Sequence, residues 1–199
     1  GEGVDPHDWS PSAQDIETLH HADLVVANGS HLEAAIDEVL DEVSAPVFRA
    51  MEHVASPRPL DDGALPEGTP DVQGDPLGAF DPHFWTDPLA MRDVVLSLGP
   101  VVAGSGIDAT ARQADLVARL EALDAEVRTT LEVVPPERRK LVTGHESMGY
   151  FADRYGFELV GAIVPGLSSQ GEVSASQLAA ISETIREQGV PAVFTEIGT

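Results

Sequence analysis

The feature that most restricts how this chain can fold is the alternation of short apolar, β-prone runs with segments of helical periodicity. Such runs occupy residues 23–29, 46–48, 140–143, 157–164 and 192–194. Apolar runs without polar alternation suit strands that are covered on both faces of a parallel sheet. Because helical patterns separate the runs, the sequence predicts an α/β fold with parallel sheets flanked by helices.

Several helices carry recognisable signals at their ends. Ser10, which precedes a proline, is expected to cap a first helix, and a second helix is expected over residues 30–43. Asp87, also before a proline, is expected to open another helix. Ser174 with Gln177 three residues later forms a capping box ahead of the last helix.

The longest helix is predicted in the middle of the chain. Its apolar residues recur at spacings of three and four, at Leu116, Leu120, Leu123, Val127 and Leu131. Two prolines then end the pattern. We therefore divide the chain into an N-terminal βα lobe over 1–104, a linking long helix within 105–136 and a C-terminal βα lobe over 137–199.

Residues 52–79 are rich in proline, glycine and aspartate and show little periodicity. A stretch of this length without secondary structure is usually functional or mobile, so we expect one flexible surface loop. It holds a single histidine, His53, and several carboxylates. Its contribution to gathering metal ions is therefore expected to be weak.

The charge and the absence of cysteine narrow the function. The chain has 11 basic and 34 acidic side chains, a formal net charge of −23, which repels phosphate backbones and excludes nucleic acid as an expected partner. Without cysteine, any metal must be held by imidazole and carboxylate. No apolar run is long enough to span a bilayer, and the first residues lack the pattern of a signal sequence.

One pattern of five residues occurs twice, as Asp5-Pro6-His7-Asp8-Trp9 and as Asp81-Pro82-His83-Phe84-Trp85. Proline restricts the backbone before each histidine, so the imidazole is presented from a stiff loop and loses less entropy on coordination. Asp5 and Asp81 are placed to accept a hydrogen bond from a ligating imidazole or to cap a helix. The two tryptophans are candidates to wall the site from water. Helix capping alone is the alternative, but two copies favour metal binding.

A third histidine, His145, directly follows the predicted strand over 140–143. The carboxyl ends of strands are where open α/β sheets place their ligands, so this position favours a functional role. The neighbouring Glu146 raises a metallohydrolase as an alternative. An H-E-x-x-H helix, however, needs histidine where Gly149 stands.

Three neutral imidazoles, from His7, His83 and His145, suit Zn²⁺ and leave a fourth position for water or a carboxylate. Glu196 ends the last predicted strand and is a candidate fourth ligand or hydrogen-bond partner of a ligating imidazole. The remaining histidines are expected to be solvated, capping or loop residues, namely His20, His21, His31 and His53.

These motifs resemble the metal-binding solute-binding proteins of bacterial ABC transporters for zinc and manganese, the cluster A-I or zinc-uptake-protein-like family. The resemblance runs along nearly the whole chain. Its marks are Asp5-Pro6-His7, Ala27-Asn28-Gly29 followed by Leu32-Glu33, and the segments 81–85, 143–151, 155–156 and 193–196.

The resemblance implies two βα lobes joined by one long rigid helix, with the metal site in the cleft between the lobes. It places His7, His83 and His145 on ligand positions, and histidine at the third position favours zinc while leaving manganese or iron(II) open. It also implies an extracytoplasmic protein, periplasmic or lipid-anchored. Such a protein is expected to be a monomer that delivers the ion to an ABC permease in the membrane, with a periplasmic metallochaperone as a further candidate partner.

The chain departs from the family pattern at both ends. The family begins with a strand and a helix before the first motif, and its fourth ligand is generally an aspartate beyond the last strand seen here. We therefore expect both lobes to be incomplete and the fourth ligand to lie beyond Thr199. A metal-dependent adhesin on the same scaffold stays open, and a metallohydrolase with Glu146 as base is the alternative of another class.

Overall fold

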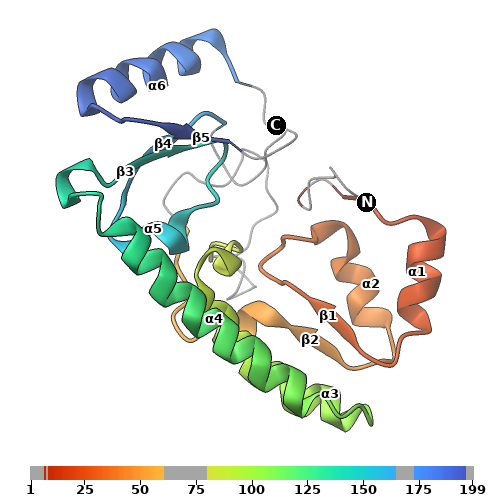
Figure 1. Cartoon of the computed structure of the whole chain (residues 1–199). Coiled ribbons are helices and arrows are strands. Elements are labelled where there is room, and N and C mark those ends of the chain that lie inside the picture. Colours follow the sequence, from red (N-terminus) through yellow and green to blue (C-terminus); the bar gives the residue numbers. More distant parts are fainter. Residues whose placement is uncertain (1–6, 8, 61–79, 165–172, 196–199) are drawn as a thin grey trace.

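In the part of the chain that the structure describes, the strands form two parallel sheets (Figure 1). In this computed structural model, which describes residues 7, 9–60, 80–164 and 173–195, β1 (Val25–Ala27) pairs with β2 (Val47–Arg49). In the second sheet, β3 (Lys140–Thr143) lies between β4 (Glu158–Ala162) and β5 (Val193–Phe194). The predicted α/β fold with parallel sheets is confirmed.

The first helix, α1 (Ala13–His20), begins two residues later than expected. Its cap is Ser12, whose hydroxyl accepts from the Asp15 backbone N–H while the Asp15 carboxylate accepts from the Ser12 backbone N–H. Ser10 was the wrong choice because the residue three positions after it is Ala13, whose side chain cannot return a hydrogen bond.

The helix predicted over 30–43 is shorter and divided. It consists of η1 (Ala34–Ile36) and α2 (Asp37–Glu42), and η2 (Ala50–His53) follows β2. Ser30 and His31 have φ values of 55° and 56°, in the left-handed region that non-glycine residues rarely adopt. These two residues cannot continue a right-handed helix, which explains its late start.

A helical hairpin of α3 (Pro88–Gly104) and α4 (Thr110–Leu131) runs along one side of both sheets in Figure 1. Pro100 lies inside α3 and cannot donate to the Leu96 carbonyl. The Gln113 side chain of α4 donates to that carbonyl at 3.1 Å and to the Val95 carbonyl at 2.8 Å. The hairpin thus replaces a missing backbone hydrogen bond. With 22 residues, α4 is the long helix that the spacing of Leu116 to Leu131 predicts.

The second half contains η4 (Pro136–Arg138), α5 (Gly149–Tyr155) and α6 (Ala175–Gln188). The predicted capping box is present, because the Ser174 hydroxyl accepts from the Gln177 backbone and the Gln177 side chain accepts from the Ser174 backbone. Gly189 ends α6 with a φ of 62°, a conformation that costs glycine little.

Two groups of buried apolar side chains support these elements. The larger, here the main core, joins residues of β2, η2, η3 (Phe84–Thr86), α3 and α5, namely Phe48, Ala50, Met51, Val54, Phe84, Ala90, Val94 and Tyr150. The smaller, here the N-terminal core, consists of Val25, Ala27, Ile36 and Leu40. Tyr150 therefore ties α5 to the first half of the chain.

Some predictions are not tested by this structure. Asp5, Glu196 and most of the loop predicted over 52–79 lie outside the described residues, and the division into two lobes at 104 and 136 stays a prediction. Among the described residues, no helix is both long and apolar enough to cross a membrane.

Candidate metal centre

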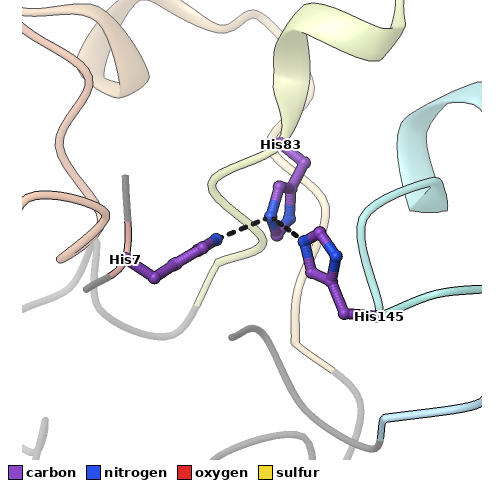
Figure 2. A group of neighbouring side chains, drawn as sticks. All are labelled: His7, His83 and His145. Atoms are coloured by element: carbon purple, nitrogen blue, oxygen red, sulfur yellow. Dashed lines mark hydrogen bonds between the residues drawn. The ribbon is translucent and has the colours of Figure 1, made fainter. Parts of the chain in front are cut away.

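Three imidazoles from distant parts of the chain meet at one point, as Figure 2 shows. One potential ligand atom from each of His7, His83 and His145 lies within 4.8 Å of the others. The Nε2 atom of His83 is 3.0 Å from Nε2 of His7 and 3.3 Å from Nε2 of His145. Lone pairs on three nitrogens at this separation suit coordination of one shared cation.

His83 is held by its own motif. The Asp81 Oδ1 atom accepts from the His83 backbone N–H at 2.9 Å and lies 2.7 Å from its ring Nδ1. Asp81 is 2% exposed and His83 is 1% exposed, so this contact is shielded from water. With the proton assigned to Nδ1 by this hydrogen bond, the lone pair of Nε2 faces the other two histidines.

His145 lies just beyond the carboxyl end of β3, as its position in the sequence predicts. Its carbonyl accepts from the Thr143 hydroxyl at 2.6 Å and from the Ser147 backbone N–H at 2.9 Å. All three residues are buried. The turn between β3 and α5 therefore presents the imidazole from a closely hydrogen-bonded segment.

The two tryptophans of the repeated pattern have different surroundings. Trp85 contacts the His83 ring edge-on, with centroids 5.2 Å apart, and is 41% exposed. Trp9 instead packs against the N-terminal core. Trp85 thus covers part of the site, whereas Trp9 anchors the segment that carries His7, which is itself half-buried.

The loop after β1 holds the second motif in place. Asn28 donates from its side chain to the Pro82 carbonyl at 3.1 Å, and the Ser30 hydroxyl donates to the Phe80 carbonyl. The Glu33 carboxylate accepts from the Gly29 backbone N–H at 3.1 Å, and burial raises the pKa of this carboxyl. Asn28-Gly29 is a mark of the family resemblance, but nothing in the sequence indicates that Asn28 positions Pro82.

Helix α5 is also tied to the start of α3, which follows His83 closely. The Arg154 Nε atom of α5 is 2.9 Å from Asp124 Oδ1 of α4 and 3.4 Å from Asp87 Oδ1, whose carboxylate caps α3. The hydrogen bond from Arg154 lowers the pKa of the Asp124 carboxyl. These contacts fix α5 relative to both helices of the hairpin.

The other histidines lie in ordinary structural positions. His31 is 2.8 Å from the Asp37 carboxylate, and His53 stacks on Phe48 with ring centroids 4.3 Å apart. His20 and His21 end α1. None of the four belongs to the group of three imidazoles.

Glu146 gives the hydrolase alternative little support. It is half-buried, and no shared set of potential ligand atoms includes it among the described residues. Gly149, which replaces the second histidine of the hydrolase motif, begins α5.

A set of three imidazole ligands without thiolate suits Zn²⁺ among the transition metals. The fold and the site together are those of a metal-binding α/β protein. This chain belongs to the family described as zinc-uptake complex component A, periplasmic, whose family model matches residues 1–198. The predicted family resemblance is confirmed.

Individual relatives bind different metals according to their names. The zinc-binding protein TroA of Treponema pallidum is 34% identical over 98% of this chain and 61% of its own length. The manganese-binding lipoprotein MntA of Bacillus subtilis is 29% identical with the same coverage. The chain therefore spans about three fifths of the length of these curated relatives.

A solved structure shows the same fold. The periplasmic zinc-binding protein TroA from Treponema pallidum superposes with a TM-score of 0.76 at 32% identity, covering 99% of this chain and 68% of that one. The fold class predicted from the alternation of strands and helices thus agrees with that of an experimentally determined relative.

Proposed function

We propose that this chain is the extracytoplasmic binding component of a zinc uptake system and holds Zn²⁺ with His7, His83 and His145. The observation that carries the proposal is the convergence of their ligand atoms within 4.8 Å. The residues come from three segments far apart in sequence, and two of them are buried. Burying polar imidazoles costs free energy, and coordination of a shared ion would compensate that cost.

The choice of zinc depends on the ligand type. Neutral imidazole nitrogens suit Zn²⁺, whereas Mn²⁺ favours carboxylate, carbonyl and water oxygens. One relative is named as manganese-binding and another, YfeA of Yersinia pestis, as iron-binding, so Mn²⁺ and iron(II) are kept as the alternative cargoes. A fourth ligand is supplied by water, an anion or a carboxylate, with Glu196 or a residue beyond Thr199 as candidates.

The proposal describes binding and delivery without turnover. The family is one of uptake components and not an enzyme class. We propose an ABC permease as the membrane partner and a periplasmic metallochaperone as a further partner. We also propose a periplasmic or lipid-anchored location and a monomeric state, while the net charge of −23 argues against nucleic acid.

The predicted division into two lobes puts the proposed zinc site between them. With the lobes at 1–104 and 137–199, His7 and His83 belong to the first and His145 to the second, so a bound ion joins the two. Movement of the segment that carries His7 away from the other two histidines would open the coordination shell and release the ion to the permease.

Metal content and competition against a zinc chelator test the proposal. Wild-type protein should bind one Zn²⁺ per chain, and the variant with His7, His83 and His145 all changed to alanine should not. A parallel titration with Mn²⁺ distinguishes the alternative cargo. Zinc affinity of the triple variant equal to that of the wild type would refute the assignment of the site.

A further inference from the structure

Arg58 reaches two carboxylates, one that contacts His83 and one on α5. Its Nη1 atom is 3.6 Å from Asp81 Oδ2, and its Nε atom is 3.2 Å from Asp153 Oδ2 on α5. Asp81 contacts His83, whereas α5 follows the turn that carries His145. The Arg58 side chain is 19% exposed, so the ion pair with Asp81 is largely shielded from solvent.

The backbone of Arg58 connects the same two segments. Its N–H donates to the Tyr150 hydroxyl at 2.9 Å, and its carbonyl accepts from the Asp81 backbone N–H at 2.8 Å. Burial raises the pKa of Tyr150 to about 12, so this side chain remains a hydroxyl at neutral pH. Arg58 is therefore held from both sides, by α5 and by the second motif.

The packing around this contact leaves no space for a larger residue on α5. A methyl group added at Gly149 would lie 2.6 Å from Asp81 Oδ2 and 2.8 Å from carbons of the Arg58 side chain. Real carbon atoms do not approach that closely without a shift of their neighbours. Gly149 thus allows α5 to lie directly against the Arg58–Asp81 pair.

The charge of Arg58 acts on the His83 imidazole through the Asp81 carboxylate, which contacts both side chains. A carboxylate that is 2% exposed is costly unless it is paired and hydrogen-bonded. Asp81 uses Oδ1 for His83 and faces Arg58 with Oδ2. Outer contacts of this kind orient a ligating imidazole and typically change metal affinity by about 10- to 100-fold.

We propose that Arg58 is a positioning residue of the metal centre: it holds Asp81 against His83 and α5 behind His145, so that these two imidazoles form one preorganised pair. The inference rests on the proposed zinc function. His7 is outside this unit, because its segment is anchored on the N-terminal core through Trp9.

The test is zinc titration against a chelator for the wild type, Arg58→Met and Arg58→Lys at one pH. Arg58→Met should weaken binding by about 10- to 100-fold, mainly through faster release. Arg58→Lys should recover part of the loss, because it keeps the charge but cannot contact two carboxylates with a planar fork. Arg92→Met is the matched control, since Arg92 is also a partly buried arginine, 28% exposed, that pairs with Asp93 and Glu121.

A second readout separates positioning from general stability. The visible spectrum of the Co²⁺-loaded protein reports ligand geometry, and it should change in Arg58→Met at full occupancy while Arg92→Met matches the wild type. Should Arg58→Met fail to fold, Arg58→Lys decides, with an expected affinity about fivefold below the wild type and an altered spectrum.

The outcomes distinguish the two proposals. Wild-type affinity and an unchanged spectrum in the folded Arg58 variants would overturn the role of Arg58 and leave zinc binding intact. Absence of zinc binding by the wild-type protein would instead overturn the proposed function itself.

Discussion

The three histidines of the metal centre have two different supports. The segments that carry His83 and His145 both pack on the main core, through Phe84 and Tyr150. Arg58 also joins these segments through its ion pairs with Asp81 and Asp153. The segment of His7 instead meets the N-terminal core through Trp9. Two of the proposed ligands are thus fixed relative to each other by packing and charge, while the third is placed by a separate group of residues.

This difference suggests how a binding site can hold an ion tightly and still release it. A preorganised pair lowers the entropy cost of coordination, because two imidazoles need no rearrangement. A third ligand on its own support can leave without disturbing the pair. We expect perturbations near His83 and His145 to affect zinc more strongly than equivalent perturbations near His7.

The largest effect should come from pH, and its steepness reports how many imidazoles coordinate. A protonated imidazole cannot ligate, and its ordinary pKa is about 6.5, so zinc affinity present at pH 7 is lost as pH falls. We expect a loss of at least about 100-fold between pH 7 and pH 5. The His7→Ala variant should show a shallower slope. Affinity that stays flat over this range would indicate a site made of carboxylates.

Single ligand removals test the comparison directly. His83→Ala and His145→Ala should each weaken zinc binding by more than about 100-fold, which exceeds the usual effect of outer contacts. His7→Ala should cost less, because water can replace a ligand on the half-buried side of the site. His53→Ala, which removes an imidazole stacked on Phe48, is the control and should bind zinc like the wild type. A loss of zinc affinity in His7→Ala that equals or exceeds the loss in the other two variants would contradict the separate support described for His7.

A smaller effect is expected from Gly149→Ala. The added methyl must displace Asp81 or Arg58, and overpacking of this kind costs about 1–3 kcal/mol, more than the gain of about 1 kcal/mol from helix propensity. Zinc affinity should fall about 10-fold. Gly104→Ala in α3 is the matched control, because nothing lies within 4 Å of its added methyl. Thermal unfolding and chelator competition measure both effects, and equal behaviour of the two variants would contradict the packing described for α5.

The smallest effect concerns charge, which acts on both supports alike. A net charge of −23 repels itself, and raising NaCl from 0.1 M to 1 M shortens the screening length from about 10 Å to about 3 Å. The free energy of unfolding of the metal-free protein should therefore rise by about 1 kcal/mol, which raises its melting temperature by about 2–4 °C. Zinc association should become slower in the same buffers, because the long-range attraction of the cation is screened. A melting temperature that falls with salt would show that favourable ion pairs outweigh the repulsion.

Local signals explain why much of the fold could be predicted. The strand Lys140–Thr143 and the capping box at Ser174 have their determinants within a few neighbouring residues. Ser30 and His31 behave differently, since their left-handed backbone accompanies a hydrogen bond from Ser30 to distant Phe80. Sequence periodicity does not indicate such a contact, so the helix was predicted to begin at residue 30, before η1 and α2.

The candidate site shows the same limit. His7 and His83 stand out because their motif is repeated, and His145 because it follows a strand. Arg58 carries no such signal, since it lies in a segment without periodicity and its partners, Asp81 and Asp153, are far away in sequence. The equivalent tryptophans of the two motifs also have unequal roles, which only their packing reveals.

X-ray absorption spectroscopy of the zinc-loaded protein tests the central claim most directly, because it reports the atoms bound to the ion. The account predicts three imidazole nitrogens at about 2.0–2.1 Å, with the outer-shell scattering of histidine rings, and one further light ligand. The imidazole contribution should fall by one in His83→Ala wherever zinc is retained. A shell of oxygen atoms without imidazole scattering would contradict the assignment of His7, His83 and His145 as the metal ligands.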